Sequence, residues 1–367
     1  MAKIAVPIGS RSDRIAKALL TLGGFVLLIA LPYSMSPYRV GQFTMVAVLA
    51  VAMMGINLLT GYNGQISLGH SFFFAVGAYT SAILMVDHSW PYLATLAPAF
   101  ALTFLLGFLF GIPALRLEGL YLALVTLALA VVAPPFIKRF GDLTGGSQGI
   151  IVSKPKAPEW SGMADDQWRY FIIVGVAVVL FVIARNLVGG RVGHALIAIR
   201  DNHIAAEAMG INLAIFKTLA FGMSTAYAGV AGALYAWTVG FVSPESFTVA
   251  HSIEFLSGAV VGGLATVIGP IFGALFTEFV PVYASDLHRA APNVVYGIAL
   301  ILVIILMPSG VVGLLKKGRD LIIDRSPRSG PGDSDDDHAL TPATTPTPGS
   351  EPVAATHQTG QPRGTSQ

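Results

Sequence analysis

Long apolar stretches separated by short polar ones run along most of the chain, and this pattern predicts helices that cross a membrane. An α-helix rises 1.5 Å per residue, so about 20 apolar residues cross the roughly 30 Å hydrocarbon core of a bilayer. The stretch 41–86 would measure about 69 Å as one helix, and the turn-forming cluster Gly61–Gln65 divides it into two spans. The other predicted spans are 18–35, 91–112, 119–137, 168–188, 215–241 and 294–312.

The segment 252–284 is too long for one span and needs a separate interpretation. Gly269-Pro270 interrupts it, and proline cannot continue a helix. Glycines spaced four apart, at Gly258 and Gly262 and again at Gly269 and Gly273, are typical of helices whose backbones pack closely. We therefore expect two short crossings or a re-entrant pair. This gives about ten spans in total, with eight as the alternative.

The composition supports the same fold class. Of the 367 residues, 54% are hydrophobic and 11% are charged, and the mean hydropathy is +0.70. Soluble domains carry about a quarter charged residues. We expect an all-α protein, a polytopic transmembrane helical bundle. The net charge of +2 and the scattered basic residues exclude a nucleic-acid binder, and the absence of cysteine excludes disulfides and thiolate metal sites.

Basic residues near span ends predict the orientation, because Lys and Arg accumulate on the cytoplasmic side. They cluster in the leader 1–17, in the loop 189–214 and at the start of the tail 316–367, so all three are predicted to be cytoplasmic. The tail becomes rich in Pro, Thr, Ser, Gly and Asp and should be disordered after about 326. The loop 138–167 is predicted to be external, although it contains basic residues: Lys138, Arg139, Lys154 and Lys156.

Several kinds of catalytic chemistry are missing from the sequence. It contains no phosphate-binding loop of the Gly-x-x-x-x-Gly-Lys-Ser/Thr type, no His-Glu-x-x-His and no Gly-x-Ser-x-Gly. We therefore predict neither catalytic residues nor a metal site. Two acids fall inside apolar stretches, where ionisable groups are costly and usually functional. Glu254 lies next to an external turn, and Glu278 lies deeper, as either a transport residue or a paired structural acid.

A first polar constellation interrupts the apolar stretch 41–86. Asn63, Gln65, Ser67 and His70 stand among glycines at the junction of two spans. Interrupted helices with polar backbone often form the substrate sites of transporters. A tight turn between two packed helices explains the same residues equally well, and the sequence leaves both interpretations open.

A second constellation lies in the loop 189–214. Asp201 is placed to cap a short helix, apolar residues recur at helical spacing after it, and Gly210 suits a left-handed stop. The polar face carries little net charge, unlike helices that bind membrane surfaces strongly. We favour a docking element for a soluble partner over an interfacial helix. Its polar residues are Arg200, Asp201, His203 and Glu207.

These motifs together resemble the permease subunits of bacterial branched-chain amino acid ABC importers, of the LivM type. The resemblance covers about 40–315. The Gly-Gln-x-Ser-x-Gly-His stretch of that family and its following Phe-rich Gly-Ala-Tyr segment match residues 64–79. The Glu-Ala-x-Gly motif, by which a coupling helix docks on the ATPase, matches Glu207, Ala208 and Gly210. The motif residues of the first stretch are Gly64, Gln65, Ser67, Gly69, His70, Phe73, Gly77, Ala78 and Tyr79.

The resemblance implies an ABC importer permease fold in a multi-pass protein of the bacterial plasma (inner) membrane. It implies a second permease subunit, two ATPase subunits that bind ATP and Mg, and an external substrate-binding protein. This chain would hold no cofactor and would not be an enzyme. Transport would follow alternating access, with Leu, Ile and Val as substrates. The coupling residues would be Arg200, Asp201, Glu207, Ala208 and Gly210.

Other functions remain open at this stage. Related permeases are expected to carry urea, short amides or other small amino acids. An ion-coupled secondary carrier would instead depend on Glu278, and a structural or signalling membrane protein would move no substrate at all. The translocation path is a hypothesis from the residues, and its candidates are Asn63, Gln65, Ser67 and His70.

Overall fold

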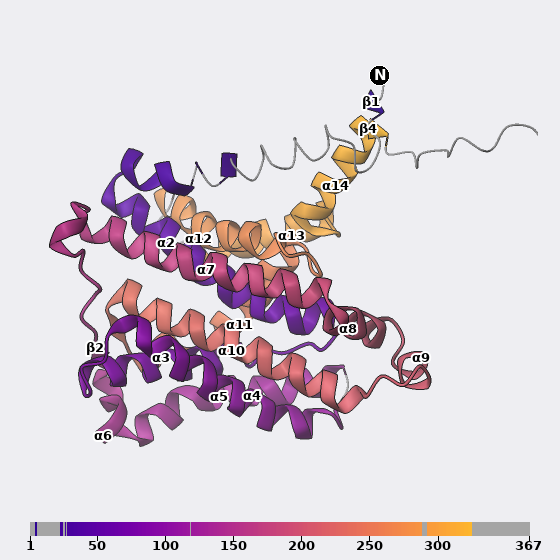
Figure 1. Cartoon of the computed structure of the whole chain (residues 1–367), viewed down its shortest axis with the longest axis horizontal. Helices are drawn as coiled ribbons and strands as arrows, with labels where there is room; N and C mark the ends of the chain where they lie inside the picture. The colour runs from indigo at the N-terminus through magenta and orange to yellow at the C-terminus, as the bar shows by residue number, and fades with distance from the viewer. Residues whose placement is uncertain are drawn as a thin grey trace, which may run out of the picture.

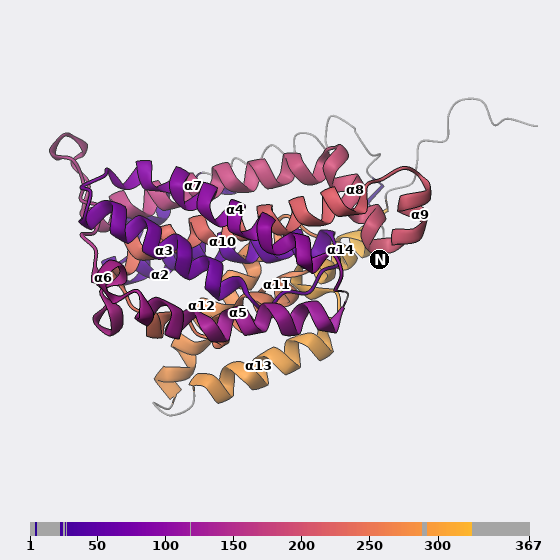
Figure 2. The ribbon, with the colours of Figure 1, turned by 90° about the horizontal axis from the view of Figure 1, so that it is seen from below.

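The computed structural model describes residues 4–5, 23–24, 26, 28–117, 119–287 and 292–324. Long helices lie side by side along one axis of the molecule (Figures 1 and 2). The expected all-α class is confirmed. The long helices are α2 (Pro37–Ile56), α3 (His70–Val86), α4 (Leu96–Ala114), α5 (Leu120–Arg139), α7 (Asp165–Gly189), α10 (Leu213–Val239), α11 (Val249–Gly262), α12 (Gly269–Leu287) and α13 (Pro292–Leu306).

Short elements connect or extend these helices. A π-helical turn, η1 (Asn57–Tyr62), continues α2 and ends inside the predicted interruption. Strand β1 (Ile4–Ala5) pairs in parallel with β4 (Ile323–Asp324), and β2 (Ile150–Ile151) pairs antiparallel with β3 (Phe241–Val242). The remaining short helices are η2 (Tyr92–Thr95), α6 (Gly141–Thr144), η3 (Gly146–Gln148), η4 (Glu159–Ser161), α8 (Arg191–Asp201), α9 (His203–Ala208), η5 (Pro244–Ser246) and α14 (Gly310–Ile322).

Among the described residues, 6 helical segments are long and apolar enough to cross a membrane. The shorter apolar helix α3, the pair α11 and α12, and the helical residues 28–34 add to these. The total is compatible with the predicted count of about ten. The six long segments are Pro37–Tyr62, Tyr92–Ala114, Leu120–Arg139, Asp165–Gly189, Leu213–Val239 and Val294–Lys317.

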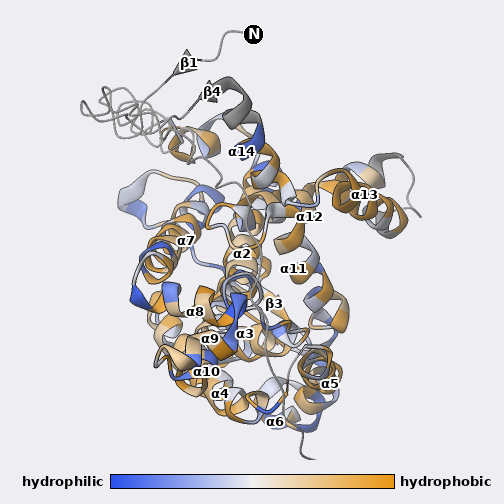
Figure 3. Ribbon diagram, turned by 90° about the vertical axis from the view of Figure 1, so that its right-hand side faces the viewer, coloured by the Kyte–Doolittle hydropathy of each residue, from blue (hydrophilic) through white to orange (hydrophobic). Residues whose placement is uncertain are grey.

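Two helices form the centre of the bundle. In the most apolar windows, 78% of Pro37–Tyr62 and 61% of Leu213–Val239 are buried, against 11% of Val294–Lys317. Viewed end-on, α2 is surrounded by other helices and α13 stands at the edge, with apolar residues along the ribbons (Figure 3). A helix that is apolar all round suits a fully packed position. Ser224 of α10 also donates to the Gly55 carbonyl of α2 at 2.6 Å.

The segment 252–284 is divided as the sequence predicts. Helix α12 begins at Gly269, and a turn at 263–268 joins it to α11. A Cβ atom added to Gly273 would collide with the backbone of Gly258, and one added to Gly262 would collide with that of Gly269. The four glycines therefore allow the two helix backbones to touch.

The basic clusters that the structure describes gather at one end of the bundle. Helices α8, α9 and α14 lie there with the β1–β4 pair, whereas α6 and β2 lie at the opposite end (Figure 1). The predicted external loop is thus far from the loop 189–214. Its Lys138 forms an exposed ion pair with Glu245 at 2.6 Å. The cytoplasmic assignment of the α8 end stays a prediction. Most of the leader 1–17 and the tail after 324 lie outside the described residues.

Asn57 connects α2 to the α11–α12 turn. Its Nδ2 donates to the Thr266 carbonyl at 2.7 Å, and its Oδ1 accepts from the Ala265 amide at 2.8 Å. Ala265 has a φ of 55°, a conformation that is uncommon for residues other than glycine. The side chain of Asn57 is fully buried. The Asn57 side chain therefore supplies hydrogen bonds to two backbone groups, which lipid could not supply.

We expect Asn57→Ala to lower the stability of the folded chain by about 1–3 kcal/mol, because it leaves two partly buried backbone groups without these partners. The measurement is the midpoint of thermal unfolding of the purified protein in detergent. Asn186→Ala is the matched control, since Asn186 is exposed on α7. Equal midpoints for the two variants would contradict this role of Asn57.

Candidate functional site

Helices α8 and α9 form a bent hairpin at one end of the bundle. Asn202 separates them in an extended conformation, and its Oδ1 accepts from the Ile204 amide at 3.1 Å and from the Ala205 amide at 3.0 Å. The prediction that Asp201 caps the short helix is wrong. Asp201 is the last residue of α8, and its carboxylate accepts from Arg200 at 2.8 and 2.9 Å. A capping residue needs an extended backbone, which Asn202 has.

Helix α9 presents apolar side chains to its surroundings. Ile204 is 70% exposed and Met209 is 84% exposed, whereas Ala206 is buried and anchors the helix. Gly210 ends the helix with a φ of 84°, as the left-handed stop predicts. Glu207 and Ala208 are also exposed. The matched Glu-Ala-x-Gly motif is thus fully accessible on an outer turn.

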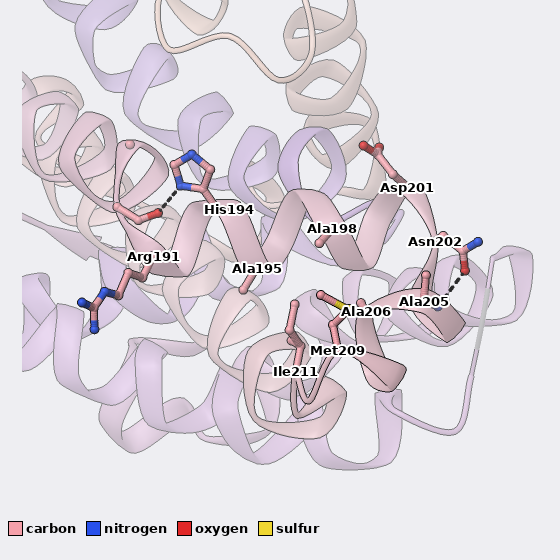
Figure 4. Close-up of a pocket in the computed structure, with 12 residues that line it drawn as sticks. Arg191, His194, Ala195, Ala198, Asp201, Asn202, Ala205, Ala206, Met209 and Ile211 are labelled. Carbon is pink, nitrogen blue, oxygen red and sulfur yellow. Dashed lines mark hydrogen bonds between the residues drawn. The ribbon is translucent and has the colours of Figure 1, made fainter.

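A groove runs between α8 and α9 (Figure 4). Its volume is about 860 Å³. His194 contributes to its lining, and its Nδ1 shares a 2.8 Å hydrogen bond with the Gly190 carbonyl. A second hollow of about 540 Å³ is lined by Glu207, by the residues 210–214 that follow α9 and by Lys217. Helix α9 thus contributes residues to two hollows, which suits contact with another protein.

The four path candidates lie together in the connection between α2 and α3. Asn63, Ser67 and His70 are at most 3% exposed, and Gln65 is half-buried. His70 shares a 2.9 Å hydrogen bond between its Nε2 and Ser224 Oγ. Both amide atoms of Asn63, Oε1 of Gln65 and Nδ1 of His70 are buried without a hydrogen-bond partner. Buried polar atoms of this kind are rare and often mark functional positions.

Arg200 joins the two constellations. Its Nη1 donates to the Gly61 carbonyl at 2.9 Å, across 139 residues of sequence. A Cβ atom at Gly64 would lie 2.8 Å from Cγ of Arg200, so the arginine also packs on this connection. The exposed hairpin therefore contacts the polar junction directly. Sequence reasoning predicted both parts and missed the contact, because no local pattern marks it.

The two intramembrane acids meet in a chamber of about 200 Å³ between α2, α3, α10, α11, α12 and α13. Within the described part of the chain, the carboxyl groups of Glu254 and Glu278 form no ion pair or hydrogen bond. Sequence reasoning identified both acids but missed their polar neighbours His251 and Thr277. The signal that could have found them is a set of polar residues on one face of an otherwise apolar segment. The chamber residues are Met45, Leu49, Phe74, Tyr235, His251, Glu254, Phe255, Thr277, Glu278, Pro281 and Tyr296.

No cluster of three or more His, Cys, Asp or Glu residues that could hold a metal ion occurs among the residues that the structure describes. The candidate site contains hydrogen-bonding groups, two carboxyl groups and exposed apolar side chains. This arrangement can bind and move a solute or a partner protein.

Comparison with known proteins agrees with this arrangement. The permease protein LivM of the high-affinity branched-chain amino acid transport system is 30% identical in Salmonella typhimurium and in Escherichia coli, over 79% of this chain and 74% of each relative. LivH of Salmonella typhimurium is 25% identical over 74% of this chain and 92% of its own. PsaBC from Streptococcus pneumoniae in complex with Fab gives a TM-score of 0.39 at 12% identity, covering 80% of this chain and 99% of that one, a likeness too weak to assign a fold.

The family model for the permease component of branched-chain amino acid transport systems matches residues 38–307. That region contains both polar constellations and every helix from α3 to α12. The resemblance expected from the motifs at 64–79 and 207–210 is confirmed. The chain belongs to the family of branched-chain amino acid transport permeases.

Proposed function

We propose that this chain is the transmembrane permease subunit of an ATP-driven ABC importer. It carries Leu, Ile and Val across the plasma membrane by alternating access. The observation that carries the proposal is the hydrogen bond between Arg200 and the Gly61 carbonyl. It connects an exposed docking hairpin to a buried polar junction, which is the connection that an externally powered permease needs.

The power for transport comes from other subunits. The sequence has no phosphate-binding loop, so ATP and Mg are bound by two separate ATPases. Helix α9 offers them exposed apolar residues, Ile204 and Met209, beside the acidic Glu207. This end of the bundle is then cytoplasmic, in agreement with its basic residues. A second permease completes the membrane part, and an external binding protein delivers substrate at the opposite end.

The mechanism follows from the contacts around α8. Closure of the ATPases on ATP pushes the α8–α9 hairpin, and Arg200 transmits the displacement to the π-helical turn η1 at Gly61. The junction that contains Asn63 and His70 then shifts against Ser224 of α10. Two discrete packings of this junction open the path to one side of the membrane or to the other.

Other functions differ in what they require. An ion-coupled secondary carrier needs an acid that binds and releases a cation, and Glu278 in the chamber is placed for that role. Urea or short amides, by contrast, would gain little from the aromatic walls at Phe74 and Phe255. These walls favour a substrate with an apolar side chain.

The proposal is tested by purifying the tagged chain in mild detergent after co-expression with its neighbouring genes. We expect two kinds of ATPase or two copies of one, together with a second permease, in the mass spectrum of the complex. Proteoliposomes that hold this complex should take up leucine only with ATP and the binding protein. Uptake that persists without ATP and is abolished by an ionophore would establish a secondary carrier instead.

The double variant Glu207→Ala with Gly210→Ala should abolish leucine uptake while membrane insertion stays normal. It removes a charge and strains the left-handed stop on the exposed docking turn. The measurements are capture of the ATPases with the tagged chain and uptake in cells. The matched control is Glu159→Ala with Gly162→Ala, which has the same spacing and a positive φ of 62° at the opposite end. Normal uptake or normal ATPase capture in the first variant would contradict the docking role.

Arg200→Ala should reduce leucine transported per ATP hydrolysed by about tenfold or more, because a charge-assisted hydrogen bond contributes roughly 1.5–3 kcal/mol. ATPase capture should stay close to that of the wild type, since the lost contact lies inside the permease. Arg191→Ala removes the same charge from the start of the same helix and serves as the control. Loss of ATPase capture in Arg200→Ala would assign Arg200 to docking rather than to transmission.

A further inference from the structure

The chamber between α11 and α12 holds two acidic side chains inside the apolar part of the bundle. Glu278 lies near the middle of α12, and the facing wall includes Met45 and Leu49 near the middle of α2. Ionisable groups at such depth are costly unless they face a cavity or meet an opposite charge. Glu254 and Glu278 face the same cavity, and within the described residues neither meets a cation. The chamber thus offers two carboxyl groups to a positively charged ligand.

A second observation points to a ligand independently of the acids. Thr277 is only 8% exposed, it lines the chamber, and its Oγ1 has no hydrogen-bond partner. His251 also lines the chamber with a buried, unpartnered Nδ1. Each such atom loses its hydrogen bonds to water on folding and forms none within the chain. A polar ligand in the chamber would supply the missing hydrogen bonds.

The other walls of the chamber are apolar and aromatic. Phe74 packs against Phe255 with ring centroids 5.2 Å apart and against Tyr235 with centroids 5.4 Å apart. Leu49 and Met45 complete this side. The volume of the chamber is about 200 Å³, below the roughly 300–1,000 Å³ of pockets for drug-sized ligands. The chamber therefore accepts only a small ligand.

We propose that this chamber is the transit site for the substrate amino acid. The α-ammonium group binds between Glu254 and Glu278, the α-carboxylate accepts from Thr277 and His251, and the branched side chain packs on Phe74 and Phe255. The inference rests on the proposed transport function and names the site within it. It separates two tasks, because the polar junction at Asn63–His70 then works as the gate and the chamber works as the binding position.

The first test locates the substrate during transport. The complete importer in proteoliposomes is given a diazirine analogue of leucine together with ATP and the binding protein, and is then irradiated. We expect the label on α11 and α12 peptides that carry Phe255 and Thr277. Label that falls instead on the connection 61–70, or on neither, in a complex that takes up leucine would overturn the proposal. Absence of uptake in the wild type would refute the proposed function itself.

The second test removes the carboxylate charges. Glu254→Gln with Glu278→Gln should lower the chamber label at least tenfold and raise the KM for delivered leucine, while labelling of the binding protein stays unchanged. Glu159→Gln, at an exposed loop position, is the control. Unchanged label and KM in the double variant would exclude an ammonium site. Wild-type leucine uptake that follows an imposed sodium or proton gradient, together with loss of that dependence in the double variant, would assign the acids to a cation instead.

Thr277→Val keeps the shape of the side chain and separates function from folding. Because the Thr277 hydroxyl has no partner within the chain, its removal should leave the thermal midpoint unchanged or raise it. Leucine uptake should nevertheless fall about threefold to tenfold, through a higher KM. Thr238→Val on α10 is the control, since Thr238 bonds only to its own helix, at the Leu234 carbonyl. A lower midpoint with unchanged uptake would make Thr277 a structural residue and overturn its role.

Discussion

The need to satisfy backbone polar groups inside a bilayer governs this structure. Regular helices satisfy their own backbone groups, but the π-helical turn and connection at 57–69 and the turn at 263–268 need partners from the rest of the chain. Asn57 supplies them for the second segment, and Arg200 supplies one for Gly61 in the first. These two side chains therefore permit the helix breaks on which the proposed gate and chamber depend.

Much of this arrangement follows from local sequence patterns. Apolar run length predicted the spans, and Gly269-Pro270 predicted where the segment 252–284 turns. The Gly210 stop and the exposure of Glu207 also follow from short-range spacing. Capping was less predictable, because Asp201 and Asn202 are both good caps and the backbone turns at the second. When two neighbouring residues cap equally well, the tertiary packing of α8 decides which of them becomes the cap. The sequence does not reveal that packing.

Contacts between distant segments were beyond sequence reasoning. Nothing near Arg200 indicates Gly61, and nothing near Glu278 indicates Thr277, His251 and Glu254 as the polar groups of one cavity. From the sequence, the polar junction at 63–70 was predicted to line the translocation path, and no link between this junction and Glu278 was predicted. The structure places the junction beside α8 and the acids deeper in the bundle. Depth along the membrane normal, which decides between a gate and a binding position, emerges only from the packed helices.

The hydrogen bonds of Asn57 connect helix α8 mechanically to the turn between α11 and α12. A displacement of α8 reaches Gly61 through Arg200, and the same π-helical turn begins at Asn57, which is bonded to the turn between α11 and α12. Both walls that carry the chamber acids are therefore attached to the segment that α8 pulls. Beyond Arg200 the connections to the turn between α11 and α12 are partly buried hydrogen bonds between neutral groups. Ionic strength screens exposed charges more than such bonds, so we expect this internal connection to depend little on the salt concentration.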